Sequence, residues 1–169
     1  MTMAQKKPVT ATIVMDELLY DIMNETYLRG RTIQDDTNYK QVASMFASLD
    51  EENQDKILRS IKKAFSEVKT ELSEYLTENG LTTDNRLISA TTNLELSLTM
   101  PSNFNEAATA GIAEAVHDYI RNSAVSDWYL VTNKADAADY TGLAARSLEN
   151  IRKSVSKRSR PMRRAAAGS

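Results

Sequence analysis

His117 is the only histidine of the chain, and Asp118 follows it directly in a stretch with helical periodicity. A histidine acts as a general base when a nucleophile and an orienting carboxylate meet it in space. The sequence contains no G-x-S-x-G motif, and without cysteine or a second histidine it excludes thiolate chemistry and multi-histidine metal sites. We therefore interpret His117 as a helix-surface or interfacial side chain.

Acidic residues cluster at Asp50, Glu51, Glu52 and Asp55. The cluster lacks the glycine and the ligand spacing of an EF-hand loop. Carboxylates in the first turn of a helix stabilise it through the helix dipole, which explains the cluster without a cation. The sequence also contains no P-loop, G-x-G-x-x-G or H-E-x-x-H motif. It therefore predicts no catalytic residue, no metal site and no cofactor, and a protein that is not an enzyme.

The charge of the chain is divided unevenly along its length. Overall, 21 basic residues oppose 23 acidic ones, for a formal net charge of −2. After residue 151 seven basic residues occur with no acidic residue among them, which leaves the rest of the chain with a net charge of −9. The seven are Arg152, Lys153, Lys157, Arg158, Arg160, Arg163 and Arg164. Such a block of like charge is typical of an interaction tail.

Three interpretations of this basic C-terminal arm, residues 157–169, are open. It can dock on an acidic protein surface, neutralise nucleic-acid phosphates, or remain a solvated tail. No aromatic residue is interleaved with the arginines, which disfavours base stacking. The acidic body also repels a duplex beyond the reach of the arm. Protein docking is therefore the favoured interpretation.

Trp128, the only tryptophan, lies beside Tyr129 in an apolar stretch. The favoured interpretation is a core anchor between the last two helices. The alternative is an aromatic anchor at a subunit interface, where tryptophan and tyrosine are enriched.

Hydrophobic periodicity predicts the elements that position these residues. Spacings of three and four predict five helices. They begin near Thr10, Thr37 and Ser48, after Asn103, and at Asn133, which is interpreted as a helix cap. Gly30 is predicted to end the first helix, Ser48 and Glu51 to form a capping box, and Asn79-Gly80 to end the third.

One strand is predicted before Pro101. Leu94, Leu96, Leu98 and Met100 alternate with polar residues, the period of a half-buried strand. Residues 86–90 are predicted to pair with it, giving a β-hairpin at about residues 86–100. An isolated hairpin is marginal in water, so this one must pack on the helices or pair with another subunit.

The expected fold class is therefore mainly α: a bundle of four to five helices with one β-hairpin and an extended basic arm. The expected organisation is a flexible lead at residues 1–9, a helical domain at 10–156 and the arm at 157–169. No apolar run reaches the 18 residues of a membrane span. Residues 1–8 are polar and show no secretory signal.

The order of motifs over residues 94–164 resembles that of a family of small helical bacteriophage proteins. These are the head–tail adaptors, also called connector or head-completion proteins, of the neck of tailed phages. Four segments carry the resemblance: Leu98-Thr99-Met100-Pro101-Ser102-Asn103-Phe104, Asp127-Trp128-Tyr129-Leu130-Val131-Thr132-Asn133-Lys134, Ala137-Ala138-Asp139-Tyr140 and Lys157-Arg158-Ser159-Arg160-Pro161-Met162-Arg163-Arg164.

The resemblance implies a structural virion protein, assembled in the host cytoplasm, that forms a ring, typically of twelve copies, below the portal. Lys157, Arg158, Arg160, Arg163 and Arg164 would dock on the portal protein. The hairpin residues Leu94, Leu96, Leu98 and Met100 would contact neighbours or the next neck or tail-completion protein. Genomic DNA would pass through the channel without sequence-specific binding.

Two alternatives stay open. The half before residue 80 is longer than a minimal adaptor, which leaves room for another neck layer, a stopper or a tail-completion protein. From a different class, a helical nucleic-acid-associated protein would contact DNA with the same basic arm, and its binding to duplex would depend strongly on salt.

Overall fold

The computed structural model describes residues 4–48, 50–77 and 80–161. Within them the chain forms five α-helices and one antiparallel pair of strands, which confirms the expected mainly helical class. The elements are β1 (Lys7–Ile13), α1 (Met15–Ile33), α2 (Tyr39–Met45), α3 (Glu51–Glu71), β2 (Leu94–Met100), the 3-10 turn η1 (Glu106–Ala108), α4 (Thr109–Thr132) and α5 (Lys134–Ser156).

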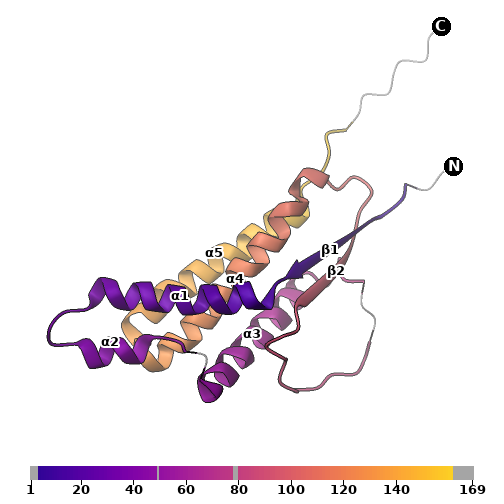
Figure 1. Ribbon diagram of the computed structural model, residues 1–169. Helices are drawn as coiled ribbons and strands as arrows, with labels where there is room; N and C mark the ends of the chain where they lie inside the picture. The colour runs from indigo at the N-terminus through magenta and orange to yellow at the C-terminus, as the bar shows by residue number, and fades with distance from the viewer. Residues whose placement is uncertain (1–3, 49, 78–79, 162–169) are drawn as a thin grey trace, which may run out of the picture.

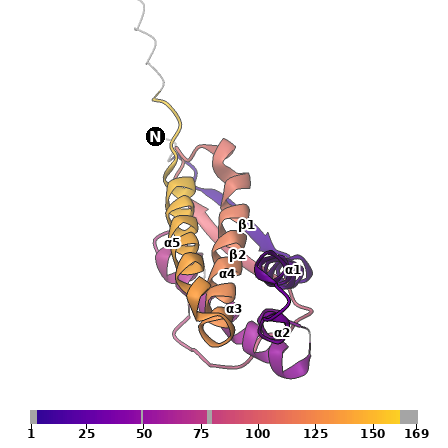
Figure 2. The same cartoon turned by 90° about the vertical axis from the view of Figure 1, so that its left-hand side faces the viewer.

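Helices α4 and α5 form the long antiparallel pair around which the other elements pack (Figures 1 and 2). Their facing sides carry small residues such as Ala115 and Ala144, which allow close approach, and Asn133 alone connects them. Asn133 occupies the predicted N-cap position of α5, but its side chain makes no capping hydrogen bond and instead donates to the Asp136 carboxylate. At 1.5 Å per residue each helix is about 35 Å long. The pair therefore sets the length of the molecule, and α1, α2 and α3 pack against α4.

The strand predicted before Pro101 exists as β2, but its predicted partner was wrong. Residues 86–90 form no strand, and β2 pairs instead with β1, with Val9 opposite Leu98. Residues 7–13, for which the sequence predicts a flexible lead and the start of a helix, therefore form a strand. Its β-branched residues Val9, Thr10, Thr12 and Ile13 suit a half-buried strand. At the start of α1 the Met15 N–H donates to the Asn93 side chain.

Helix α3 is shorter than predicted at its C-terminal end. It ends at Glu71, because the chain then joins the second edge of β2: the Thr99 N–H donates to the Tyr75 carbonyl and the Thr77 N–H to the Ser97 carbonyl. The predicted capping box is also wrong. Asp50 is the N-cap, and the Ser48 hydroxyl hydrogen-bonds the Asp50 carboxylate rather than the helix backbone.

Gly30 does not end α1, which continues to Ile33. The glycine instead permits close packing of α2, since a Cβ at this position would lie 3.1 Å from Cγ1 of Val42. Among the described residues, no helix is long and apolar enough to cross a membrane.

Candidate interaction surfaces

The basic arm begins one residue after α5 and is anchored at its root by backbone hydrogen bonds. The Asn105 N–H donates to the Lys157 carbonyl at 3.0 Å, and the Ser159 N–H donates to the Asn103 carbonyl at 2.7 Å. Phe104 and Arg158 thereby form a short antiparallel bridge, with the Phe104 ring fully buried. The first residues of the arm therefore leave the body in a defined direction.

The arginines and lysine expected to dock on a partner differ in their surroundings. The Arg158 guanidinium donates to the Val155 carbonyl at 2.8 Å and to the Lys157 carbonyl at 3.1 Å. Lys157 and Arg160 are exposed and form no ion pair within the described part of the chain. Arg163 and Arg164 lie outside the described residues. All three side chains are exposed, and Arg158 also helps hold the root through its hydrogen bonds.

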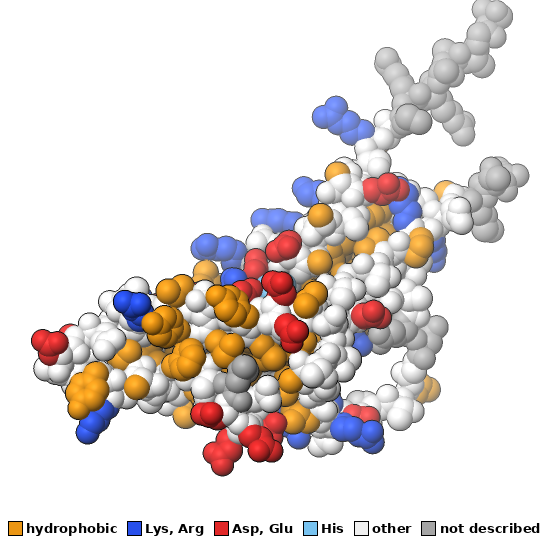
Figure 3. All heavy atoms as spheres, in the orientation of Figure 1, with side chains coloured by type: hydrophobic (Ala, Val, Ile, Leu, Met, Phe, Trp, Pro, Cys, Tyr) orange, Lys and Arg blue, Asp and Glu red, His pale blue; other side chains and the backbone are white. Residues whose placement is uncertain are grey.

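The root of the arm and the turn between α1 and α2 lie at opposite ends of the molecule (Figure 1). Basic side chains gather along the edge that leads to the arm, whereas hydrophobic ones gather over α1 and α2 (Figure 3). Because α4 and α5 span the distance between the ends, about 35 Å separates the two surfaces. The two ends of the described molecule therefore differ in surface character, basic at one end and apolar at the other.

The side chains expected as hairpin contacts are not available to a partner. Leu94, Leu96, Leu98 and Met100 are all buried in the hydrophobic core of the chain. The physical reason is the position of β2, which has β1 on one edge and residues 75–77 on the other and turns its apolar face inward. Their expected role in contacting neighbours was wrong.

Trp128 is a core anchor. Its side chain is buried, and its indole Nε1–H donates to the Met45 carbonyl at 2.8 Å, which ties α4 to the end of α2. Tyr129 is fully buried beside it. Its ring meets that of Tyr140 edge-on at 5.4 Å between centroids. Neither residue presents a surface to a partner.

A polar network that the sequence analysis did not single out joins α1 to α5. The Arg29 guanidinium donates to both carboxylate oxygens of Asp136 at 2.7 and 2.9 Å, and the Tyr140 hydroxyl donates to Glu25 at 2.6 Å. The hydrogen bonds from Arg29 hold the pKa of the buried Asp136 carboxyl below its usual value. An acid in the first turn of a helix was visible in the sequence, but its partner 107 residues away was not.

His117 pairs with Asp21 of α1 and not with its sequence neighbour Asp118. Its Nε2 lies 2.7 Å from Oδ2 of Asp21 in a polar cleft that also contains Glu17, Glu114 and Arg121. Within the described residues no group of three or more histidine, aspartate or glutamate side chains could hold a metal ion. The pair links α1 to α4, so the half-buried His117 has a partner within the chain.

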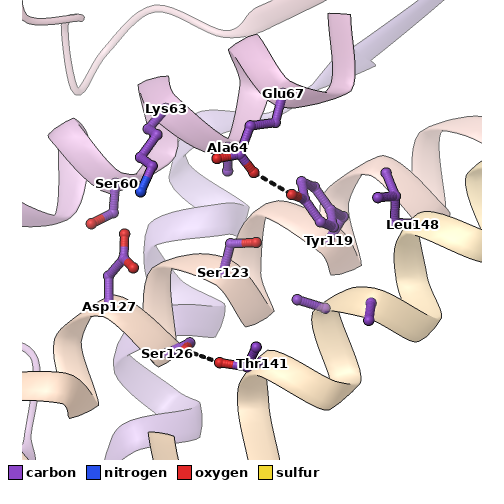
Figure 4. A pocket seen from close by; sticks show the side chains of 12 residues that line it. Ser60, Lys63, Ala64, Glu67, Tyr119, Ser123, Ser126, Asp127, Thr141 and Leu148 are labelled. Atoms are coloured by element: carbon purple, nitrogen blue, oxygen red, sulfur yellow. Dashed lines mark hydrogen bonds between the residues drawn. The ribbon is translucent and has the colours of Figure 1, made fainter. Parts of the chain in front are cut away.

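A groove opens between α3 and α5, with α4 as its floor (Figure 4). We call it the α3–α5 groove. It has a volume of about 330 Å³ and is lined by residues that include Ser60, Lys63, Tyr119, Asp127, Thr141 and Ala145. The Tyr119 hydroxyl donates to Glu67 of α3, and burial, followed by that hydrogen bond, raises the pKa of Tyr119 to about 12.

The α1–α2 end of the molecule exposes aromatic side chains. Tyr27, Tyr39 and Phe46 are 47%, 55% and 39% exposed, and Val131 at the end of α4 is 73% exposed. Tyr27 and Phe46 stack edge-to-face at 5.9 Å, and Phe46 lines clefts on both sides of α2, one of which reaches Val131. We call Tyr27, Tyr39, Phe46 and Val131 the aromatic end.

Comparison with known proteins finds no counterpart for this architecture. No protein-family model matches the chain, and no curated protein and no solved structure matches it.

Proposed function

We propose that this protein is a structural component of a tailed-phage virion, a head–tail adaptor that forms a ring below the portal. The observation that carries the proposal is the separation of a rooted basic arm from an exposed aromatic end by the length of α4 and α5. An adaptor needs two such surfaces, one for the portal and one for its neighbours. The resemblance of residues 94–164 to the adaptor family points to the same role.

The root of the arm suits docking on a large partner. Backbone hydrogen bonds at Lys157 and Ser159 set the direction in which the arm starts, while Lys157 and Arg160 keep exposed charges. An arm that orders on its partner gains contact area at a cost in conformational entropy. In a ring, repeated weak contacts add through avidity, so each arm needs only modest affinity.

The acidic body supports the proposed position around the genome channel. Residues 1–151 carry a net charge of −9. Such a surface repels phosphate and lets DNA pass without sequence-specific binding. The next neck or tail-completion protein would bind the face of the ring away from the portal.

Replacing Arg158, Arg160, Arg163 and Arg164 by alanine tests the docking arm. The matched control replaces Lys56, Arg86, Lys134 and Arg146, which are exposed, outside the arm and without ion pairs in the described chain. Both variants have the same net charge. We expect the arm variant to bind the portal oligomer of the same genome roughly 100-fold more weakly, because avidity multiplies each lost contact, and the control to bind as the wild type.

The masses of the chain, the portal oligomer and their mixture give the readout, with circular dichroism to check the fold. A complex with matching copy numbers that the arm variant fails to form supports the proposal. Unchanged binding by the arm variant contradicts it. A chain that ignores the portal but binds duplex DNA with strong salt dependence favours the nucleic-acid alternative.

A further inference from the structure

The two ends of the described chain lie at the same end of the molecule (Figure 1). A side chain from the start of β1 contacts the loop before η1, and the basic arm leaves α5 beside that same loop. The N-terminal strand and the C-terminal arm therefore meet at residues 103–106. We call the contacts among Lys7, residues 103–106 and residues 157–159 the root clasp.

Lys7, the first residue of β1, is the contact from the N-terminal side of the root clasp. Its Nζ donates to the Phe104 carbonyl at 3.1 Å and forms an ion pair with Glu106 of η1, also at 3.1 Å. The Glu106 side chain is 75% exposed, and an exposed ion pair contributes little. A hydrogen bond from a charged group to a partly buried carbonyl contributes more. Lys7 therefore acts mainly on the backbone of residue 104.

The arm contacts the same residue from the other terminus of the chain. Phe104 and Arg158 form the antiparallel bridge, and the buried Phe104 ring fixes the loop to the core. The Arg158 guanidinium donates to the Val155 carbonyl in the last turn of α5 at 2.8 Å and to the Tyr75 hydroxyl at 3.4 Å. One partner of the bridge is thus held by Lys7, and the other is held by its own side chain.

The backbone hydrogen bonds of the root clasp hold the chain end only weakly by themselves. The two bonds join Asn105 to Lys157 and Ser159 to Asn103. Chain ends open locally at little cost in free energy, and fixing the backbone of a residue costs about as much as one hydrogen bond contributes. The side-chain contacts therefore decide what fraction of molecules hold the arm in its starting direction.

We propose that Lys7 is a positioning residue for the arm. Through the Phe104 carbonyl it keeps the root clasp closed and preorganises residues 157–160 for the portal, without contacting the portal itself. The inference rests on the proposed function for the identity of the partner. Preorganisation raises affinity because ordering precedes binding. When only a fraction of the arms is in the competent state, the apparent affinity falls by that fraction.

Lys7→Met tests the inference, because it removes the ammonium group and keeps an unbranched side chain. Lys6→Met is the matched control. Lys6 is the preceding residue, is exposed and forms no ion pair in the described part of the chain, so both variants lose the same charge. Lys7→Arg keeps a charged donor and is expected to restore the wild-type behaviour. Circular dichroism and urea unfolding check that all three variants fold.

Amide hydrogen exchange, followed by NMR, measures the root clasp in the absence of a partner. The probes are the N–H groups of Asn105 and Ser159, the donors of the two backbone hydrogen bonds. We expect both to exchange about tenfold faster in Lys7→Met, because a hydrogen bond from a charged group contributes about a factor of ten to an equilibrium constant. Lys6→Met and Lys7→Arg are expected to exchange at the wild-type rate. Unchanged exchange in Lys7→Met overturns the inference.

Binding to the portal oligomer of the same genome measures the effect on docking. We expect Lys7→Met to bind roughly tenfold more weakly, because a smaller competent fraction in each arm multiplies over the arms that engage. Lys6→Met and Lys7→Arg are expected to bind as the wild type does. Equal losses in Lys6→Met and Lys7→Met would assign the effect to charge alone and overturn the inference.

A double-mutant cycle separates positioning from direct contact with the portal. The second change replaces Arg160, Arg163 and Arg164 by alanine and keeps Arg158. If Lys7 acts through the arm, Lys7→Met weakens binding by less than about twofold in that background. The same loss in both backgrounds means that Lys7 contacts the portal directly, which overturns the inference. Faster exchange in Lys7→Met together with a wild type that does not bind the portal would uphold the root clasp and contradict the adaptor function.

Discussion

Tyr129 and Tyr140 contact each other in the core, yet their hydroxyl groups differ in hydrogen bonding. The Tyr140 hydroxyl donates to Glu25, whereas the Tyr129 hydroxyl is buried without a hydrogen-bond partner among the described residues. A buried polar group without a partner loses its hydration and gains nothing in return. The pair therefore offers a comparison in which the same deletion has opposite consequences.

Tyr129→Phe is expected to raise the free energy of unfolding by about 1 kcal/mol, because the substitution removes an unpaired hydroxyl. Tyr140→Phe is expected to lower it by about 1–2 kcal/mol, because Glu25 loses its donor. Urea unfolding of the two variants and the wild type measures both changes. Destabilisation by Tyr129→Phe would show that its hydroxyl has a partner in solution.

Among the elements, β2 differs most from the sequence-based prediction, because its partner is β1 and not residues 86–90. It pairs with β1 and receives residues 75–77 on its other edge, so three segments distant in the sequence meet around it. Its inward side chains are part of the core, and the sheet serves stability within the chain. The exposed apolar side chains lie mostly on the helices, and exposed cations lie at the start of the arm.

Leu96→Ala is expected to lower the free energy of unfolding by about 2–5 kcal/mol, since truncation of a fully buried leucine loses burial and leaves a cavity. Leu81→Ala, at a fully exposed position, is the control and is expected to change stability by less than about 0.5 kcal/mol. Thermal and urea unfolding test both. Equal stabilities would return β2 to the role of an intermolecular contact.

For the whole molecule, buried tyrosines couple helix packing to pH. Tyr119 connects α4 to α3 through Glu67, and Tyr140 connects α5 to α1 through Glu25. Burial is the main cause that raises the pKa of each phenol, to about 12 for Tyr119. The folded chain thus keeps protons that the unfolded chain loses above pH 10.

We expect the free energy of unfolding to fall as pH rises from about 10 towards 12. Over this range the unfolded state binds fewer protons at these tyrosines than the native state does. Below pH 10 the contribution is fully present. Replacing Tyr119 and Tyr140 together by phenylalanine is expected to make this alkaline decline shallower. Urea unfolding at a series of pH values compares the two proteins, and equal slopes would contradict the assignment.

The amino-acid pattern is sufficient to predict the local features. Periodicity located five helices and the strand at Leu94–Met100, Asn133 marked the start of α5, and the charge pattern placed the arm directly after it. These features depend on hydrogen bonds and side-chain spacing within a few residues, since each helical N–H bonds four residues back.

Which distant segments meet depends on how the whole chain packs. The strand that pairs with β2 is β1, near the start of the chain, with Val9 opposite Leu98. The partner of Asp136 is likewise distant in the sequence, at Arg29. The same holds for exposure: Trp128 is buried, whereas Tyr39 and Val131 are left on the surface. A side chain's pattern shows that it prefers burial, but only the packing of all elements decides which apolar groups find cover and which remain for a partner.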